Sequence, residues 1–356
     1  MSRKIAVAFS GGIDSAIAAW ILKQSGNSVT GILLDVLDQK RNAEHAKIIA
    51  DQVEIPLKVL DLHDVFTREI VLPFVQEYAQ GRTPNPCIIC NAKIKCGWLL
   101  EWALDNNFHY LATGHYARIG YNAQKKAYLL KKGLDERKDQ SYFLYRLTQK
   151  QLSHLVFPLG NLEKSTIKKI ANSLNLSVCA HKESQEICFL QGSDYQDFFK
   201  KYSPAALKPG PVCDKDGNVL GTHRGLAFYT IGQRKGLNLS KKGPHYVVTI
   251  DKGENKIIVG SDNDLLKRSL IADSIHFIIA PKSRKETVYA QIRYNQTMKR
   301  AVLELLNEKE ARVTFEEPMR AIAPGQSVVF YKDTTIIGGG IITRSIPLHN
   351  CTPKNP

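Results

Sequence analysis

The chain has 356 residues, more than a single hydrophobic core usually supports, so we expect two or three domains. A hydrophobic content of 43% excludes a disordered chain, and the lack of a long apolar run argues against a membrane span or a secretion signal. Lys and Arg outnumber Asp and Glu by 49 to 34, yet residues 1–90 hold only 9 basic against 10 acidic side chains. The positive surplus therefore lies in the rest of the chain, where it favours a polyanionic partner.

Short apolar runs alternate with helical patterns in the first half of the chain. Strands are expected at residues 4–9, 29–34, 57–60 and 110–113, with a strand-like turn at 176–179. Helices are expected at residues 14–24, 41–52, 98–106 and 166–174. Repeated strand–helix–strand units predict a parallel sheet with right-handed crossovers. We expect this α/β domain to cover residues 1–204.

Gly and Pro then divide the chain into short β-rich stretches, which predicts a small central β domain over residues 205–270. Regularly spaced short strands follow at residues 274–279, 287–294, 299–306, 310–315, 327–331 and 336–342. This spacing indicates a small antiparallel β-barrel, and we expect it to occupy residues 271–356.

A glycine-rich segment, Ser10-Gly11-Gly12-Ile13-Asp14-Ser15, joins the first expected strand to the first expected helix. Free backbone N–H groups and the positive end of the helix dipole form an anion site at such a junction, and glycines let a phosphate approach closely. The serine hydroxyls can donate hydrogen bonds, and Asp14 could orient the loop or a bound Mg²⁺. The alternative is a simple N-capped turn. The chain contains neither the P-loop motif of phosphotransferases nor the glycine motif of dinucleotide-binding enzymes.

This strand–loop–helix arrangement resembles the PP-loop of the N-type ATP pyrophosphatases, which split ATP into AMP and pyrophosphate while adenylating an oxygen. Further segments make the chain similar to one branch, the tRNA-specific 2-thiouridylases, which thiolate the wobble uridine of certain tRNAs. These segments are residues 81–86 leading to Cys90-Asn91, then 113–116, 138–144, 183–189 and 232–237, and finally Arg293-Tyr294. The resemblance spans about residues 4 to 345.

The resemblance implies an ATP-dependent tRNA-uridine 2-sulfurtransferase with an adenine nucleotide alpha hydrolase-like fold, using ATP and Mg²⁺. Its implied partners are the tRNA anticodon stem-loop and a sulfur donor, either a cysteine desulfurase or a sulfur relay protein. The implied ATP-binding residues are Ala8, Phe9, Ser10, Gly11, Gly12, Ile13, Asp14 and Ser15, with the adenine near Leu34 and Gly114. The implied contacts to the target base and the tRNA are Asn85, Pro86, Cys87, His115, Lys138, Asp139, Gln140, Arg293, Tyr294 and Gln326.

Seven cysteines are too few for a disulfide framework in a chain of this length, so a reducing, cytoplasmic location is expected. Replacing an oxygen by sulfur needs a sulfur nucleophile and a group that discharges the carrier, and two thiols can do both. Lysines 93, 95 and 182 flank the cysteines and would lower their pKa. By resemblance, Cys188 holds a persulfide and Cys90 attacks it, which leaves a disulfide between the two.

Cys87 departs from the family pattern, in which many members carry Asp. With Cys90 and the distant Cys188 it could instead ligate a [4Fe–4S] cluster whose free iron binds the sulfide to be transferred. The remaining cysteines, Cys96, Cys179, Cys213 and Cys351, are expected to be ordinary core or surface residues.

Lysine and arginine pairs suit phosphate contacts, although any single pair is usually only a solvated surface. The pairs are Lys125-Lys126, Lys131-Lys132, Arg234-Lys235 and Lys241-Lys242. Two rival functions stay open. One is a PP-loop ligase of the lysidine or GMP synthetase type, and the other is a non-catalytic tRNA-binding or Fe–S scaffold protein.

Overall fold

The computed structural model describes residues 2–37, 40–177, 187–190, 194–237, 239 and 243–347, without the side chains of residues 40–42. Several positions singled out above lie outside the described residues: Cys179, Lys182, residues 183–186, Lys241, Lys242 and Cys351. The chain divides into two compact units. The first unit comprises Met1–Ile70, Cys87–Phe189 and Asp333–Ile337, and the second comprises Val71–Pro86, Leu190–Lys332 and Gly338–Pro356.

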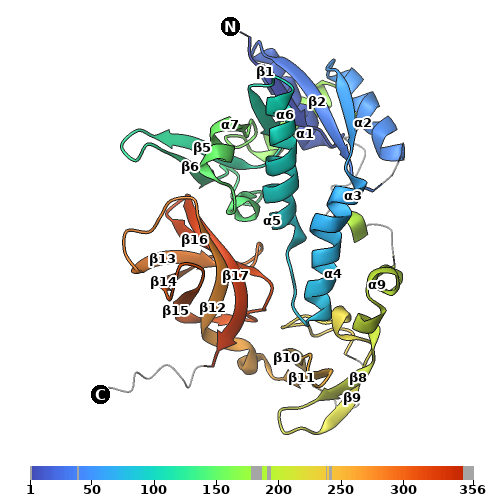
Figure 1. Ribbon diagram of the computed structural model, residues 1–356, viewed down its shortest axis with the longest axis vertical. Helices are drawn as coiled ribbons and strands as arrows, with labels where there is room; N and C mark the ends of the chain where they lie inside the picture. The colour runs from blue at the N-terminus through green and yellow to red at the C-terminus, as the bar shows by residue number, and fades with distance from the viewer. Residues whose placement is uncertain are drawn as a thin grey trace. The chain divides into compact units, whose positions relative to one another are not determined.

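A five-stranded parallel sheet organises the first unit (Figure 1). Its strands are β1 (Lys4–Ala8), β2 (Ser28–Asp35), β3 (Leu57–Asp61), β4 (Tyr110–Thr113) and β7 (Leu155–Val156). They lie in the order β3-β2-β1-β4-β7, and every neighbouring pair is parallel. The predicted parallel-sheet domain is thus confirmed, with β7 as an additional strand. The expected strand-like turn at 176–179 is wrong for Leu176 and Ser177, which belong to no strand.

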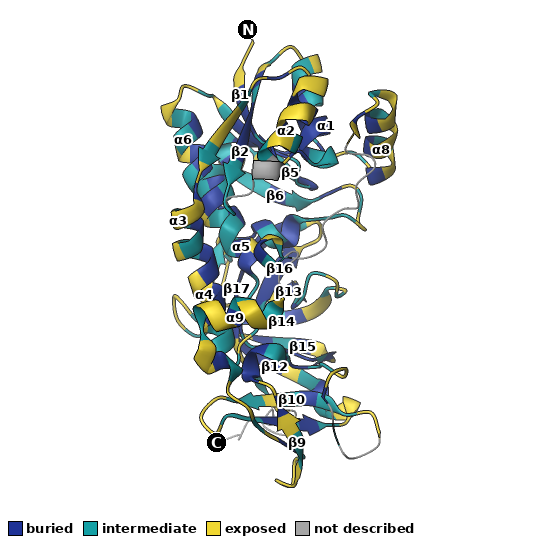
Figure 2. Ribbon diagram, turned by 90° about the vertical axis from the view of Figure 1, so that its right-hand side faces the viewer, coloured by how far each residue is buried: buried dark blue, intermediate teal, exposed yellow. Residues whose placement is uncertain are grey.

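Helices α1 (Ile13–Gln24), α2 (Lys40–Gln52) and α8 (Lys164–Ser173) agree closely with the expected helical segments. The core of this unit joins β1 to the inner face of α1, where Val7 and Ile17 are fully buried. In Figure 2, α1 is largely dark blue, whereas the outer surface of α2 is yellow. Burial of β1 explains its continuous apolar sequence, since helices cover both faces of a sheet of this kind.

One helical segment, from Pro86 to Asp105, changes its winding along its length. It begins as α5 (Pro86–Cys90), continues as the π-helix η2 (Asn91–Trp98) and ends as α6 (Leu99–Asp105). The wide turn brings the Ala92 carbonyl oxygen to 2.8 Å from the position that a Cβ on Gly97 would take. Sequence patterning predicted only the last part, at residues 98–106, because a π-helix does not follow the 3.6-residue repeat.

The first unit also contains an antiparallel hairpin of β5 (Ala117–Asn122) and β6 (Ala127–Lys132), which sequence patterning did not predict. On its other side, β6 pairs with Thr335 and Ile336. Helix α7 (Gln149–His154) follows the hairpin. The short helices α3 (His63–Phe66), η1 (Thr67–Val71), η3 (Ser141–Leu144) and η5 (Cys188–Leu190) complete the elements used below.

The second unit holds a small four-stranded sheet in the order β10-β11-β8-β9. Its strands are β8 (Gly210–Cys213), β9 (Val219–His223), β10 (Tyr246–Asp251) and β11 (Lys256–Gly260). Val212, Val247 and Ile257 are fully buried in its core. Helices α4 (Leu72–Ala79) and α9 (Tyr195–Tyr202) and the short helices η6 (Pro204–Leu207), η7 (Leu226–Phe228) and η8 (Asp262–Leu265) belong to the same unit. A small β-rich central domain was expected, and this sheet confirms it.

Six antiparallel strands form a closed barrel in the order β12-β15-β14-β13-β16-β17, with β12 pairing back onto β17. They are β12 (Leu266–Phe277), β13 (Lys285–Gln291), β14 (Lys299–Leu305), β15 (Ala311–Arg320), β16 (Ser327–Lys332) and β17 (Thr335–Ile346). The predicted barrel is confirmed, but β12 and β17 are longer than expected. Register shifts along their pairing, including one between Asp273 and His276, interrupt the alternation that marks a strand in the sequence.

The described helices include none with both the length and the apolar character needed to cross a membrane.

Packing around α1 gives a direct stability prediction. Ile17 is fully buried in the core, whereas Ile48, on α2, is 54% exposed. We expect Ile17→Ala to lower the free energy of unfolding by about 2–5 kcal/mol, because it removes buried methylenes and leaves a cavity. The matched change Ile48→Ala should cost less than about 0.5 kcal/mol. Urea denaturation followed by circular dichroism measures both values, and equal losses would contradict this account of the core.

Candidate active site

The loop after β1 is built to expose backbone donors. Gly11 has φ +74°, and a Cβ there would lie 3.0 Å from the Ala46 Cα, so the position requires glycine. The Ser15 hydroxyl donates to the Gly12 carbonyl at 2.9 Å and accepts from the Ser10 N–H at 3.2 Å. Gly12 caps α1 without a side-chain hydrogen bond to its first turn. The N–H groups at the start of α1 are therefore available to an anion.

Two further predicted nucleotide residues flank this loop. Ala8, the last residue of β1, pairs with Ile32 of β2 on one side and Thr113 of β4 on the other. Leu34 and Gly114 lie just beyond these partners, at the same carboxyl edge of the sheet. A Cβ on Gly114 would lie 2.9 Å from the Asp14 carbonyl carbon, so the chain after β4 can approach the start of α1 this closely only with glycine. The structure thus gathers Leu34, Gly114 and the 8–15 loop at one edge, where parallel sheets bind ligands.

A buried lysine that sequence reasoning missed pairs with the loop. The Lys164 ammonium donates to both carboxylate oxygens of Asp14, at 2.7 and 2.9 Å, and the Tyr116 hydroxyl donates to one of them at 2.7 Å. The Lys164 side chain is only 8% exposed. It comes from the first turn of α8, 150 residues from Asp14, so no local motif could reveal it. Asp14 orients the loop as expected, but because its carboxylate is bonded to two protein donors we assign it no Mg²⁺ contact.

Cys87 and Cys90 lie on α5, and Cys188 begins η5 in the same unit. Phe189 anchors the segment after Cys188, with its ring 5.9 Å from that of Phe66. All three cysteines are free thiols. A disulfide between Cys90 and Cys188 is therefore not supported in this state of the protein.

The surroundings of these cysteines oppose ionisation, and one lysine counteracts them. Desolvation raises the pKa of Cys87, Cys90 and Cys188, and that of Cys90 reaches about 11. The positive charge of Lys95 acts in the opposite direction on each of the three thiols. Burial acts to lower the pKa of Lys95 itself, but the neighbouring cysteines outweigh it and leave that pKa raised. Lys95 is thus the cation of the cysteine cluster, carried there by the π-helix.

Among the residues described, His, Cys, Asp and Glu side chains form no group of three or more that could hold a metal ion. The three cysteines influence each other's pKa, but they are not arranged as a cluster-binding set. The possible [4Fe–4S] cluster on Cys87, Cys90 and Cys188 therefore has no support from this geometry.

His115 is a neutral residue of this unit. Burial, with the charge of Lys95 as a second cause, lowers its pKa to about 3. Its Nδ1 lies 2.7 Å from the Thr113 hydroxyl, and its ring packs edge-on against Phe157. An imidazole held neutral in this way can exchange hydrogen bonds with a base but cannot neutralise a phosphate.

The expected tRNA segment Lys138–Gln140 is held by internal hydrogen bonds. The Asp139 carboxylate accepts from the Gly133 and Ser141 N–H groups at 2.9 and 3.1 Å, and burial raises its pKa. The Gln140 side chain accepts from the Tyr116 N–H at 3.1 Å. These two side chains shape the loop, so a tRNA contact by this segment stays a prediction.

Within the second unit, two predicted regions meet although they are far apart in the sequence. The Gln326 amide donates to the Thr83 carbonyl at 2.8 Å, which fixes Gln326 next to the turn that leads to Asn85 and Pro86. The Arg293 guanidinium donates to the carbonyls of Ile231 and Ala321 at 2.9 and 3.1 Å.

Tyr294, beside Arg293, accepts from the Gln291 amide through its backbone carbonyl at 2.8 Å. Arg293 thus ties the barrel to the loop before Gly232, and a tRNA contact by Arg293 or Tyr294 stays a prediction.

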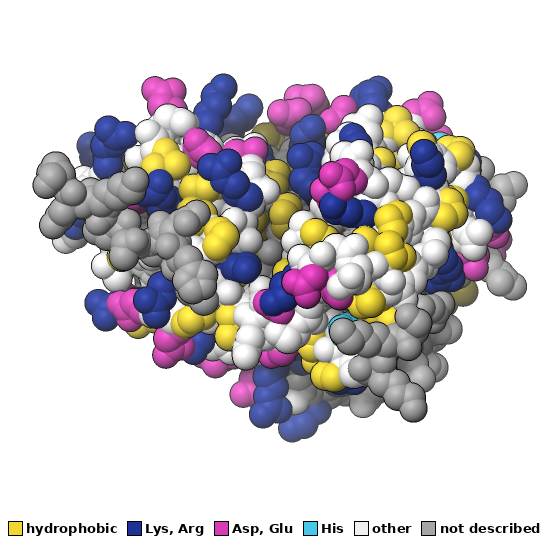
Figure 3. Space-filling view, turned by 90° about the horizontal axis from the view of Figure 1, so that it is seen from below, with side chains coloured by type: hydrophobic (Ala, Val, Ile, Leu, Met, Phe, Trp, Pro, Cys, Tyr) yellow, Lys and Arg dark blue, Asp and Glu magenta, His cyan; other side chains and the backbone are white. Residues whose placement is uncertain are grey.

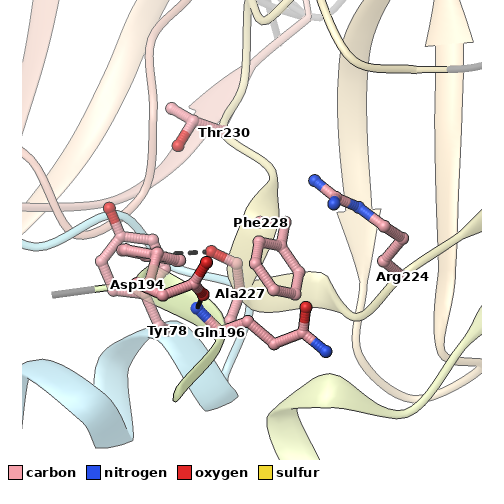
Figure 4. Close-up of a pocket in the computed structure, with 8 residues that line it drawn as sticks. Tyr78, Asp194, Gln196, Arg224, Ala227, Phe228 and Thr230 are labelled. Atoms are coloured by element: carbon pink, nitrogen blue, oxygen red, sulfur yellow. Dashed lines mark hydrogen bonds between the residues drawn. The ribbon is translucent and has the colours of Figure 1, made fainter. Parts of the chain in front are cut away.

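A surface pocket of about 450 Å³ in the second unit contains none of the predicted site residues (Figure 4). It is lined by Tyr78, Asp194, Tyr195, Gln196, Arg224, Ala227, Phe228 and Thr230. The Tyr195 hydroxyl donates to the Ala227 carbonyl at 3.1 Å, and the Asp194 carboxylate accepts from the Gln196 N–H at 2.6 Å. Since these polar groups already have partners, we assign no ligand to this pocket.

Family models match the chain in three consecutive parts. They are described as a tRNA methyl transferase HUP domain over residues 3–192, a tRNA methyl transferase PRC-barrel domain over 196–261 and an aminomethyltransferase beta-barrel domain over 267–342. The tRNA-specific 2-thiouridylase MnmA 2 of Thermoanaerobacter sp. is 45% identical, with 97% of this chain and 99% of that protein covered. The tRNA-specific 2-thiouridylase MnmA of Desulforamulus reducens is 40% identical over 98% of this chain and 100% of its own length. The chain belongs to the tRNA-specific 2-thiouridylase family.

Among solved structures, the NMN synthetase of Francisella tularensis has a partial likeness to this 2-thiouridylase-family chain. Its TM-score is 0.35 at 19% identity, over 56% of this chain and 73% of that one.

The Asp14–Lys164 pair of this family member should show strong energetic coupling. Lys164→Met leaves a partly buried carboxylate without its cation, so we expect a loss of stability that Asp14→Asn in the same chain partly restores. A double-mutant cycle by urea denaturation should give a coupling energy of about 1–3 kcal/mol. The exposed pair Lys47–Asp51, with both side chains 59% exposed, is the control and should couple by no more than about 0.5 kcal/mol. Equal coupling in the two pairs would contradict a special role for Lys164.

The alkylation rate of the Cys90 thiol measures the effect of Lys95 on its pKa. Because its charge favours the thiolate, Lys95→Met should raise the pKa of Cys90 further and slow alkylation by iodoacetamide. Mass spectrometry of Cys90-containing peptides over a range of pH measures this shift. Lys95→Arg keeps the charge and should preserve most of the reactivity. If Cys90 of the Lys95→Met protein were alkylated at the wild-type rate, Lys95 would have no effect on the reactivity of this thiol.

Proposed function

We propose that this chain is an ATP-dependent tRNA 2-thiouridine synthase. The observation that carries the proposal is the presence, in one unit, of a loop with exposed backbone donors at the sheet edge and of three cysteines that share one half-buried lysine. Family membership supports the same reaction, because its curated relatives are named tRNA-specific 2-thiouridylases. The loop suits a triphosphate, and the thiols suit transfer of sulfur rather than of a methyl group.

In the first step the wobble uridine becomes activated. Its O2 attacks the α-phosphorus of ATP, and pyrophosphate leaves while the base is held as an O2-adenylate. Activation is needed because a carbonyl oxygen is a poor leaving group, whereas AMP is a good one. The N–H groups of Gly11, Gly12 and Ile13 would hold the phosphates, with Gly12 giving up its 3.3 Å hydrogen bond to the Ser10 hydroxyl, and the neutral His115 could hydrogen-bond to the extruded base.

In the second step sulfur replaces AMP. A persulfide on Cys188 attacks C2 of the adenylated base through its terminal sulfur, and AMP departs. The Cys90 thiolate then attacks the Cys188 sulfur, the bond to the terminal sulfur breaks, and that sulfur stays on C2 as the thione. The products are 2-thiouridine and a transient disulfide, which an external thiol reduces before the next cycle. Lys95 would favour the Cys90 thiolate at the moment of attack.

The sulfur on Cys188 would come from a donor protein, a cysteine desulfurase or a relay protein. Mg²⁺ would accompany ATP and neutralise its phosphates, although no residue of the loop is assigned to it. The anticodon stem-loop of tRNA is the proposed substrate, with Asn85, Pro86, Cys87 and Gln326 as proposed contacts near the target base. Lys138, Asp139, Gln140, Arg293 and Tyr294 are proposed contacts to the rest of the tRNA.

The test is mass spectrometry of tRNA nucleosides after incubation with ATP, a persulfide source and the protein. We expect 2-thiouridine with the wild type and none with Cys188→Ser or Cys90→Ser, while tRNA affinity stays within a few fold. Cys213→Ala, a change in β8 of the other unit, is the control and should keep the activity. Thiolation by Cys188→Ser would refute the sulfur-carrier role.

Two further measurements separate the proposal from its rivals. A non-catalytic tRNA-binding protein would release no pyrophosphate from ATP in the presence of tRNA. A cluster-dependent enzyme would lose thiolation when iron is removed, whereas the persulfide route predicts that an iron-free protein remains active.

A further inference from the structure

The hairpin of β5 and β6 concentrates positive charge and contains no acidic residue of its own. Its residues 117–132 include Arg118, Lys125, Lys126, Lys131 and Lys132, and no Asp or Glu. Lys125 and Lys126 are exposed in the turn, and the other three basic residues are half-buried on the strands. The hairpin therefore carries five positive charges on 16 residues.

Strand register places two of these cations directly opposite each other. Arg118 pairs with Lys131, and Gly120 pairs with Leu129 on the same side of the hairpin. Like charges at opposed positions of an antiparallel pair are destabilising, since their side chains lie close together. We call the side formed by Arg118, Gly120, Leu129 and Lys131, together with the turn Lys125-Lys126, the basic face.

The basic face is open at its centre, next to Gly120. Around the position that a Cβ on Gly120 would take, no heavy atom of the described chain lies within 4 Å. Glycine inside a strand weakens it, and it often marks a place where another backbone approaches closely. Lys126 sits at φ +48°, a conformation that favours Gly or Asn, so a lysine is kept there at some cost in stability.

The opposite side of the hairpin fastens it to the rest of the unit. Leu130 is fully buried there, and Ile336 pairs with it from the neighbouring strand. The Gln149 side chain bonds both backbone groups of Tyr128, accepting from its N–H at 2.7 Å and donating to its carbonyl at 3.0 Å. The basic face is thus presented on a fixed support.

Cations elsewhere in the described structure are commonly neutralised within the chain. In the barrel, Lys299 pairs with Glu317 at 2.7 Å and Arg312 with Glu304 at 3.3 Å. On the face drawn in Figure 3, Lys and Arg side chains are interspersed with Asp and Glu. By contrast, no carboxylate of the described residues lies within 4.0 Å of the charged groups of Arg118, Lys125 or Lys126. The charges of Arg118, Lys125 and Lys126 are therefore not neutralised by an acid of the described residues, although the Arg118 Nε donates to the Lys132 carbonyl at 2.7 Å.

We propose that the basic face of the β5–β6 hairpin binds the sugar-phosphate backbone of the tRNA substrate. Phosphates passing over Gly120 would lie between the Arg118–Lys131 pair and the Lys125-Lys126 turn, and they would relieve the repulsion within that pair. Such contacts supply affinity without reading bases, so the hairpin holds the RNA while other residues select the uridine. This inference rests on the proposed function, because it takes tRNA as the substrate.

The same charges could have a simpler purpose. Strand β5 is at the edge of its sheet, and lysines on edge strands prevent pairing with other chains. That role predicts self-association, and no change in tRNA affinity, when the charges are removed. The two roles therefore give opposite results in a binding experiment.

The first test compares Lys125→Gln/Lys126→Gln with a matched pair, Lys168→Gln/Lys169→Gln, on the exposed surface of α8. Both double variants lose the same charge in the same unit. Binding of unmodified tRNA, without ATP or a sulfur source, is measured from about 50 to 200 mM salt. Because two phosphate contacts are removed, the affinity advantage of the wild type over the hairpin variant should shrink about tenfold across this range. The α8 variant should follow the wild type.

The second test blocks the face without changing its charge. Gly120→Val has room for its side chain and favours the strand, so thermal stability should be kept or raised. The added bulk should nevertheless weaken tRNA binding at least about threefold. Unchanged affinity in both hairpin variants, or self-association as their only change, would overturn the proposal. Since binding is measured without turnover, this result would leave 2-thiouridine formation by the wild type as a separate question.

Discussion

The ion pair between Asp14 and Lys164 is the interaction on which the glycine-rich loop of the first unit depends. It connects the loop after β1 with α8, and the Tyr116 hydroxyl adds the chain after β4 to the same carboxylate. Three segments far apart in the sequence therefore meet at one acid. The pair is partly shielded from water, so its attraction is stronger than that of the exposed pairs on the molecule. The Asp14–Lys164 pair holds the loop in a conformation that leaves its backbone N–H groups exposed.

The lysine at the glycine-rich loop and the lysine at the cysteines have different partners in this unit. At the loop, the protein's own cation is bonded to a protein acid, which leaves the backbone dipoles at the start of α1 to meet an anion. At the cysteines, no acid of the described residues pairs with Lys95, and its charge acts on the thiols. Desolvation still dominates there and keeps the thiols protonated at neutral pH. A thiol at such a site reacts faster when a change in its surroundings favours the thiolate.

Segments whose apolar residues repeat with a strict period form the expected strands and helices in the structure. The four strands and the helices around the loop have regular apolar repeats, and the loop itself is a contiguous motif. Elements that break the period could not be found in this way, namely the π-helix after Cys90 and the bulged strands β12 and β17. The hairpin after His115 was also missed, although its register is regular. Lys164 was missed in the sequence analysis for another reason. It is an ordinary lysine in an ordinary amphipathic helix, and only the tertiary structure brings it to Asp14.

The π-helical winding after Cys90 determines which side chain lies one turn from this cysteine. In an α-helix, the residue one turn after Cys90 would be Ile94, whose apolar side chain is buried here. The π-helix widens that turn by one residue, so Lys95 takes the corresponding place. The ammonium group near the thiols thus depends on a main-chain hydrogen-bond pattern as well as on the identity of one side chain. Rewinding of residues 91–98 into an α-helix would exchange a charged neighbour for an apolar one, with every functional side chain still present in the sequence.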